Sequence, residues 1–173
     1  MKGIILYQSK YGATKKYADW LAEATGFTCV ETKKAELAAV KSCDTIVLGG
    51  GIYASGIAGL SFLKKNYNQL KDRKIIVFCV GASPYDETAM QQIIQHNMRD
   101  EMRAIPVFYC RGAWDESVMG FADRALCKML QKSVAKMDPA NCEPWMTALM
   151  DAAGQKCDWT DRAYLSPILK ELG

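Results

Sequence analysis

The sequence is poor in histidine and has no long apolar run, and each scarcity removes a class of function. The single histidine, His96, has no Cys or carboxylate partner at ligand spacing, so we expect an exposed helix residue and no metal site. No apolar stretch approaches the ~20 residues that span a bilayer. The apolar run Met1–Leu6 is too short for the core of a signal peptide. We therefore expect a cytoplasmic protein with no transmembrane segment.

The cysteines lack any pairing pattern. Seven of them are scattered along the chain without a C-x-x-C pair, which argues against a disulfide framework, a zinc site and dithiol redox chemistry. Cys29, Cys79 and Cys110 fall in apolar segments, where a free thiol packs as a small core residue. Cys142 and Cys157 fall in a polar tail, where reactive peripheral thiols remain an alternative.

Neither sign of charge predominates in the sequence. The 22 basic and 19 acidic residues leave a net charge of +3, and they alternate along the chain without forming a basic stripe, so nucleic-acid binding is not expected. The length of 173 residues, half of them apolar, suits one domain with a buried core.

Apolar runs alternate with amphipathic segments, which is the pattern of a parallel sheet covered by helices on both faces. We predict an α/β fold: a doubly wound, five-stranded parallel sheet of order 2-1-3-4-5. The predicted strands are Gly3–Gln8, Phe27–Thr32, Asp44–Gly50, Lys74–Gly81 and Val107–Arg111. The predicted helices between them are Thr14–Thr25, Ala35–Lys41, Gly59–Leu70 and Glu87–Ala104.

The alternation stops after the fifth strand. We predict a single domain, residues 1–173, with a core at 1–112 and an elaborated C-terminal extension at 113–173. Within the extension we expect a helix over Glu116–Lys136 and a closing helix over Thr160–Leu172. The first should carry one apolar face formed by Val118, Phe121, Ala122, Ala125 and Met129. We expect the Trp and Met side chains of the extension to pack over the sheet edge; a substrate or quinone pocket, or a surface for partner docking, is the alternative.

One loop carries the chemistry. It joins the first strand to the first helix and reads Ser9, Lys10, Tyr11, Gly12, Ala13, Thr14. Free N–H groups and the positive end of the helix dipole gather at such a point, where they favour a phosphate. Neither G-x-x-x-x-G-K-[ST] nor G-x-G-x-x-G is present there, and neutral Gln8 and Ser9 exclude the metal site of a receiver domain. An ordinary turn with Thr14 as helix N-cap is the alternative.

The residues around this loop resemble the flavodoxin signature. Ile5–Leu21 contains an apolar-aromatic strand end, then Ser-x-x-small-x-Thr, then Ala and an apolar residue on the helix. The glycine two residues before Thr14, together with the strand spacing, is similar to flavodoxin-domain proteins that include menaquinone-dependent protoporphyrinogen oxidase. The resemblance covers Met1 to about Gly112, and extends more weakly to Asp158-Trp159 and the apolar helix after them.

The resemblance implies bound FMN and two further cofactor segments. The first, at the end of the third strand, comprises Gly50, Gly51, Ile52, Tyr53 and Ala54. Its glycines would let the backbone approach the flavin ring, and Tyr53 would stack on it. The second, at the end of the fourth strand, comprises Gly81, Ala82, Ser83 and Tyr85. Its backbone N–H groups would meet the pyrimidine edge, and Tyr85 is another candidate to stack on the ring. These two segments and the phosphate loop follow three strand ends, where this fold binds its ligands.

The function implied is that of an FMN-dependent oxidoreductase in which the flavin carries the electrons and no side chain acts as acid or base. Its partner would be a small-molecule or quinone electron acceptor, with peripheral membrane contact left open. The alternatives are an electron-transfer module that serves a redox protein, and an interaction domain without flavin. Carrier flavodoxins are strongly acidic, so a mildly basic chain fits the electron-transfer module less well.

Overall fold

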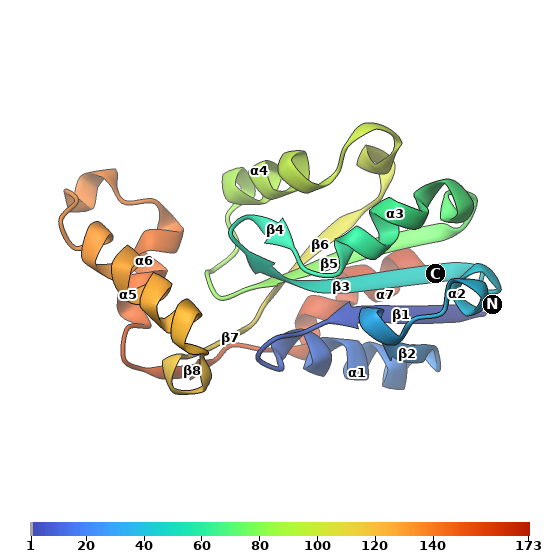
Figure 1. Ribbon diagram of the computed structural model, residues 1–173, viewed down its shortest axis with the longest axis horizontal. Helices are drawn as coiled ribbons and strands as arrows, with labels where there is room; N and C mark the ends of the chain where they lie inside the picture. The colour runs from blue at the N-terminus through green and yellow to red at the C-terminus, as the bar shows by residue number, and fades with distance from the viewer. Residues whose placement is uncertain (1) are drawn as a thin grey trace.

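The computed structural model describes residues 2–173. Its central sheet contains five parallel strands in the order β2-β1-β3-β5-β6 (Figure 1). The strands are β1 (Gly3–Gln8), β2 (Thr28–Glu31), β3 (Thr45–Tyr53), β5 (Lys74–Gly81) and β6 (Val107–Arg111). The predicted α/β fold and its 2-1-3-4-5 order are confirmed, since the fourth and fifth predicted strands are β5 and β6.

Helices cover both faces of the sheet, as Figure 1 shows. On one face lie α3 (Leu60–Leu70) and α4 (Glu87–Asn97), and on the other lie α1 (Ala13–Thr25) and α7 (Ser166–Leu172). The short helix α2 (Leu37–Lys41) follows a 3-10 turn at Thr32–Lys34. No helix in residues 2–173 combines the length and apolar character that crossing a membrane requires.

Two apolar cores result from the alternation of side chains along each strand. Successive residues of a strand point to opposite faces, and a parallel sheet buries both of them. Ile5, Val47 and Ile76 join the core beneath α1 and α7. Leu6, Leu48 and Val77 join the core beneath α3 and α4. Burying both faces leaves only the strand ends accessible, and the loops at their carboxyl ends are therefore the places where chemistry can occur.

The buried thiols belong to these cores. Cys79 and Cys110 lie on β5 and β6 with no solvent exposure, and burial raises the pKa of Cys79 to about 12. A thiol held protonated in this way is a poor nucleophile. All seven cysteines are free, and these two act as packing residues.

The predicted third strand is too short. β3 continues past Gly50 to Tyr53, and a two-residue turn at Ala54 and Ser55 returns the chain as β4 (Gly56–Ile57), antiparallel to β3. Both turn residues have positive φ, 46° and 65°. The segment predicted as a ring-flanking loop is thus the end of a strand and its hairpin, which holds its backbone more firmly than a free loop would.

The predicted helix Glu87–Ala104 is too long. α4 ends at Asn97, and Asp100–Ala104 forms a separate 3-10 turn. The buried Asn97 side chain explains the break: its Oδ1 accepts from the Ile57 N–H at 3.0 Å and its Nδ2 donates to the Ser55 carbonyl at 2.6 Å. Asn97 therefore ties α4 to the β3–β4 hairpin.

The C-terminal extension is an excursion between two short strands. β7 (Ala113–Asp115) pairs antiparallel with β8 (Lys156–Asp158). Between them lie a 3-10 turn at Glu116–Val118, helix α5 (Phe121–Val134), another turn at Pro139–Asn141 and helix α6 (Pro144–Asp151). Figure 1 shows α5 and α6 beyond the carboxyl ends of the strands, away from both chain ends.

Two expectations for the extension are therefore wrong. The helix predicted over Glu116–Lys136 begins only at Phe121, because Gly120 at the N-cap separates it from the preceding turn. Its apolar face does not cover the sheet: Phe121 is 91%, Met129 60% and Val118 58% exposed. The closing segment, Arg162–Leu165 followed by α7, does pack on the sheet. Trp159 also lies at the sheet edge as expected, with its ring 4.1 Å from the Arg111 guanidinium of β6.

We predict that Gly50→Ala destabilises the protein by about 2 kcal/mol or more, because overpacking of a tight contact costs on this order. A Cβ at Gly50 would lie 2.0 Å from the Ala58 backbone carbonyl oxygen, so β3 and the segment after β4 would have to separate. Gly56→Ala is the matched control, since its Cβ would meet nothing closer than 3.4 Å. Urea denaturation measures both; equal midpoints for the two variants would contradict the prediction.

Candidate functional site

A cavity of about 320 Å³ opens at the carboxyl ends of the strands. The three segments singled out in the sequence all line it. They contribute Ser9, Tyr11, Ala13 and Thr14 from the first, Gly51, Ile52, Tyr53 and Ala54 from the second, and Gly81 and Ala82 from the third. The cavity lies within the range of small-molecule and cofactor sites.

One end of the cavity is suited to an anion. α1 begins at Ala13 with Gly12 as N-cap, in a left-handed conformation at φ 96° that glycine adopts without strain. The first N–H groups of an α-helix have no partner within the helix, and here no side chain caps them. The Ser9 hydroxyl accepts from the Gly12 N–H at 3.1 Å, which shapes the loop. The first turn of α1 carries no acidic residue, so the helix dipole is not offset from within the helix.

A carboxylate from the extension reaches this loop. Asp123 on α5 accepts a short hydrogen bond from the Tyr11 hydroxyl and pairs with the Lys10 ammonium group. The Lys10 ammonium, with the Tyr11 hydroxyl, lowers the pKa of Asp123, and Asp123 in turn raises the pKa of Lys10. The Gly120 N–H also approaches the Tyr11 hydroxyl at 3.4 Å. The start of α5 is thereby attached to the loop that precedes α1.

Tyr53 forms the wall between this loop and the β3–β4 hairpin. The Lys10 ammonium lies 5.8 Å from the centroid of the Tyr53 ring and 5.6 Å from that of Tyr11, within range of cation–π attraction. Burial raises the pKa of Tyr53, so its hydroxyl stays protonated at neutral pH. The wall is aromatic and uncharged, which suits a planar apolar ligand.

The segment after β5 divides between two places. Gly81 and Ala82 line the main cavity, whereas Ser83 lines a smaller adjoining cavity of about 170 Å³ beneath α6. Tyr85 turns away: its hydroxyl donates to Glu87, and its ring lies 5.9 Å from that of Tyr109.

Five of the residues singled out in the sequence do not line the main cavity. Lys10 and Gly12 shape the phosphate-type loop from outside, and Ser83 and Tyr85 lie beyond the cavity wall. Gly50 is buried against Ala58, so its lack of a side chain serves packing within the protein.

The extension supplies a wall that the local sequence did not identify. Trp114, Met119, Asp123, Leu126, Cys127 and Leu130 line the cavity, together with Val80, Gly112 and Ala113 near the strand ends. The only sequence signal was the concentration of Trp and Met after residue 113, which allowed a pocket as an alternative to packing on the sheet. Residues 2–173 contain no group of three His, Cys, Asp or Glu side chains that could hold a metal ion, and His96 is exposed.

The returning strand of the extension is attached to α1. The Lys16 ammonium donates to the Asp158 carboxylate at 2.9 Å and to the Thr160 hydroxyl at 2.7 Å. Tyr17, also on α1, donates to the Arg111 carbonyl at 2.6 Å and accepts from the Asp161 N–H at 3.1 Å. Helix α1 therefore carries the end of the cavity that is suited to an anion and also holds the base of the extension.

Comparison with known proteins identifies the family. A family model described as a flavodoxin domain matches residues 4–140, which includes the strands of the sheet, the cavity loops and α5. The chain belongs to the flavodoxin domain family. No curated protein sequence matches the chain at a significant level.

Solved structures resemble this flavodoxin-domain protein at low identity. A flavodoxin from the domain Archaea is 16% identical with a TM-score of 0.42, covering 75% of this chain and 92% of its own. The Trp repressor binding protein from Bacillus subtilis is 13% identical with a TM-score of 0.49, covering 64% and 83%. A flavoprotein in complex with FMN from Lactobacillus acidophilus is 16% identical with a TM-score of 0.43, covering 64% and 91%.

We predict that the stabilisation from Asp158 disappears in acid. The Thr160 hydroxyl, and then Lys16, lower the pKa of Asp158 to about 2, below the value near 4 of an unfolded Asp. The stabilisation that Asp158 gives the folded state is therefore complete above about pH 4 and is lost as the pH falls through about 2. The melting temperature of Asp158→Asn should lie below that of the wild type at pH 7 and converge with it toward pH 2. Asp72→Asn, at an exposed position, is the control; a constant difference across the pH range would contradict the prediction.

Proposed function

We propose that this flavodoxin-domain protein is an FMN-dependent oxidoreductase that holds its cofactor in the cavity at the carboxyl ends of β1, β3 and β5. The observation that carries the proposal is that an anion-binding helix start and an apolar, aromatic-walled chamber belong to one cavity. FMN has these two parts, a phosphate and a planar ring. We propose in addition that the protein acts in the cytoplasm, in keeping with seven free thiols.

The residues fit this cofactor with a clear division of roles. Ser9, Thr14 and the N–H groups at the start of α1 would hold the phosphate. Tyr53 would lie against the ring, and the backbone at Gly51, Gly81 and Ala82 would border its edge. Glycine and alanine leave room for the ring to approach the backbone at these positions. Bound FMN supplies redox chemistry that no side chain of the cavity provides.

The extension determines what else can reach the flavin. Trp114, Met119 and Leu126 give the cavity an apolar wall on the side away from the sheet. This wall would exclude water and accept an apolar reactant. Within the family we propose the quinone-linked branch similar to menaquinone-dependent protoporphyrinogen oxidase, with a small-molecule or quinone electron acceptor. A flavodoxin-type module that passes electrons to a protein partner is the second candidate, favoured by the exposed apolar face of α5.

The central test is a double substitution at the phosphate end. Ser9→Ala with Thr14→Ala should weaken FMN binding by about 100-fold or more, because each hydrogen bond to a charged group contributes about 1.5–3 kcal/mol. Quenching of flavin fluorescence on titration measures the affinity. Thr14→Ser keeps a hydroxyl at this nearly buried position, 3% exposed, and should keep most of the affinity. A wild-type protein that binds no FMN would disprove the proposal.

Asp123→Asn tests the electrostatics of the same site in the opposite direction. The carboxylate neutralises Lys10 beside the proposed phosphate site, so removing its charge should strengthen FMN binding about tenfold, or about 1.4 kcal/mol for one nearby charge at the protein surface. Riboflavin, which has no phosphate, should bind the variant and the wild type equally. An equal change in affinity for both flavins would place the phosphate away from Lys10 and Asp123.

A further inference from the structure

The outward face of α5, the side turned away from the cavity, carries both exposed apolar and basic side chains. Of the eight large apolar side chains that are exposed within residues 2–173, six belong to the extension: Val118, Phe121, Leu126, Met129, Met137 and Met150. Two of the six, Phe121 and Met129, lie on α5 outside the cavity, whereas Leu126 lines the cavity. Phe121 is the extreme case at 91% exposure.

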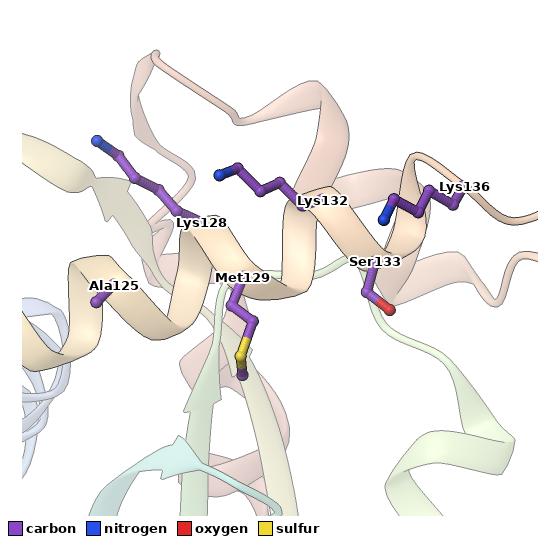
Figure 2. Close-up of a pocket in the computed structure, with 6 residues that line it drawn as sticks. All are labelled: Ala125, Lys128, Met129, Lys132, Ser133 and Lys136. Atoms are coloured by element: carbon purple, nitrogen blue, oxygen red, sulfur yellow. The ribbon is translucent and has the colours of Figure 1, made fainter.

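Three lysines stand beside these apolar residues. Lys128 and Lys132 lie four residues, about 6 Å, apart along the axis of α5, and Lys136 follows in the turn just after the helix ends at Val134. Together with Ala125, Met129 and Ser133 they border a shallow hollow of about 430 Å³. Figure 2 shows Lys128 and Lys132 extending from one side of α5 and Met129 from the other. Phe121 precedes Lys128 by seven residues, about two helical turns, and so lies on the same side of α5 as Lys128 and Lys132. The face thus combines a row of positive charge with one exposed aromatic side chain that a partner could cover.

This face adjoins the proposed flavin cavity. Leu126 and Cys127 line the cavity, whereas the neighbouring Ala125 and Lys128 line the outward hollow. The two sites lie on opposite sides of a single helix, so anything docked on the hollow is separated from the cavity by the width of α5.

We propose that the outward face of α5 is the docking surface for an acidic redox protein that exchanges electrons with the flavin. Carboxylates of the partner would pair with Lys128, Lys132 and Lys136, and Phe121 would be covered by its apolar surface. At protein interfaces, a few aromatic side chains often contribute most of the binding energy, and charged residues lie around them. The electron-exchange part of this inference rests on the proposed FMN binding.

Charge distinguishes this partner from other occupants of the face. A second copy docked face to face would bring the two lysine rows together, which is unfavourable. An anionic membrane attracts the summed charge near its surface, and residues 113–158 carry seven acidic residues against five basic ones. The other two basic residues are engaged elsewhere: Arg124 donates to backbone carbonyls at Glu116, Ser117 and Met119, and Lys156 pairs with Asp115. The three lysines are therefore a local row of positive charge, which suits a discrete cluster of carboxylates on a protein better than a uniformly charged plane.

The test uses the FMN-loaded full chain and a reduced plant-type [2Fe–2S] ferredoxin as the acidic donor. Two ferredoxins would each lose one electron, and the two electrons with two protons from water would pass to the bound FMN. Binding is measured by calorimetric titration, and electron transfer by stopped-flow bleaching of the flavin. Wild-type binding should weaken as salt is raised, because exposed charges are screened.

The decisive variant is Lys128→Gln/Lys132→Gln/Lys136→Gln. We expect its affinity for ferredoxin and its second-order rate of electron transfer to fall about tenfold at low salt. Both quantities should also lose most of their salt dependence. The control is Lys33→Gln/Lys34→Gln/Lys64→Gln, which makes the same change in net charge at exposed positions on the turn after β2 and on α3. It should change the ferredoxin affinity and the second-order rate by less than about twofold. Phe121→Ala should weaken binding about fivefold, the effect of a moderate anchor residue.

Three outcomes would overturn the inference. The first is a wild type that does not bind ferredoxin at low salt, and the second is equal behaviour of the two triple variants. The third is an intact ferredoxin rate in the decisive variant together with lost binding to vesicles of phosphatidylserine and phosphatidylcholine, which would assign the face to a membrane. The proposed function fails separately, through the absence of a bound flavin spectrum, and calorimetry still measures docking in that case.

Discussion

The parallel alignment of β1, β3 and β5 is the constraint on which the rest of this structure depends. Because the three strands run the same way, their carboxyl ends meet at one edge of the sheet, and their loops must meet there as well. Burial of both sheet faces keeps the strands in this register, since a slip of one residue would exchange every side chain between the two cores. The cavity between these loops is therefore a consequence of packing far from it.

At the end of β3, glycines let the strand backbone lie very close to neighbouring segments. Added side chains at Gly49 and Gly50 would meet the Phe78 ring and the Ala58 carbonyl oxygen, both at 2.0 Å. These glycines let the end of β3 lie against its neighbours, so that Gly51 and Tyr53 arrive at the cavity in a fixed position. Asn97 completes the arrangement by holding the β3–β4 hairpin with its side chain. The wall of the cavity at Gly51 and Tyr53 is thus held in place by buried contacts.

The sequence predicts the sheet well because its strands are buried on both faces and read as continuous apolar runs. It predicts the helix ends less well, because side-chain contacts decide them: nothing near Asn97 in the chain shows that its amide will bond to Ser55 and Ile57. The loop proposed to bind the phosphate can be recognised in the sequence because its residues are contiguous. The contact of Asp123 with Tyr11 spans 112 residues, and no local pattern contains it. An apolar helical face indicates burial, yet on α5 the buried side is the one that bears Cys127 and Leu130, which face the cavity.

Helix α5 carries two features of this structure on opposite sides. Its first turn carries Asp123, which binds the loop at the proposed phosphate site, and its outward side carries Phe121 and the lysine row. If a docked partner shifts α5 even slightly, the contact of Asp123 with Lys10 changes, and with it the affinity for a dianionic phosphate. Thermodynamic linkage makes the effect reciprocal: the factor by which a partner alters FMN affinity equals the factor by which FMN alters partner affinity. The extension would in this way link cofactor retention to the choice of partner.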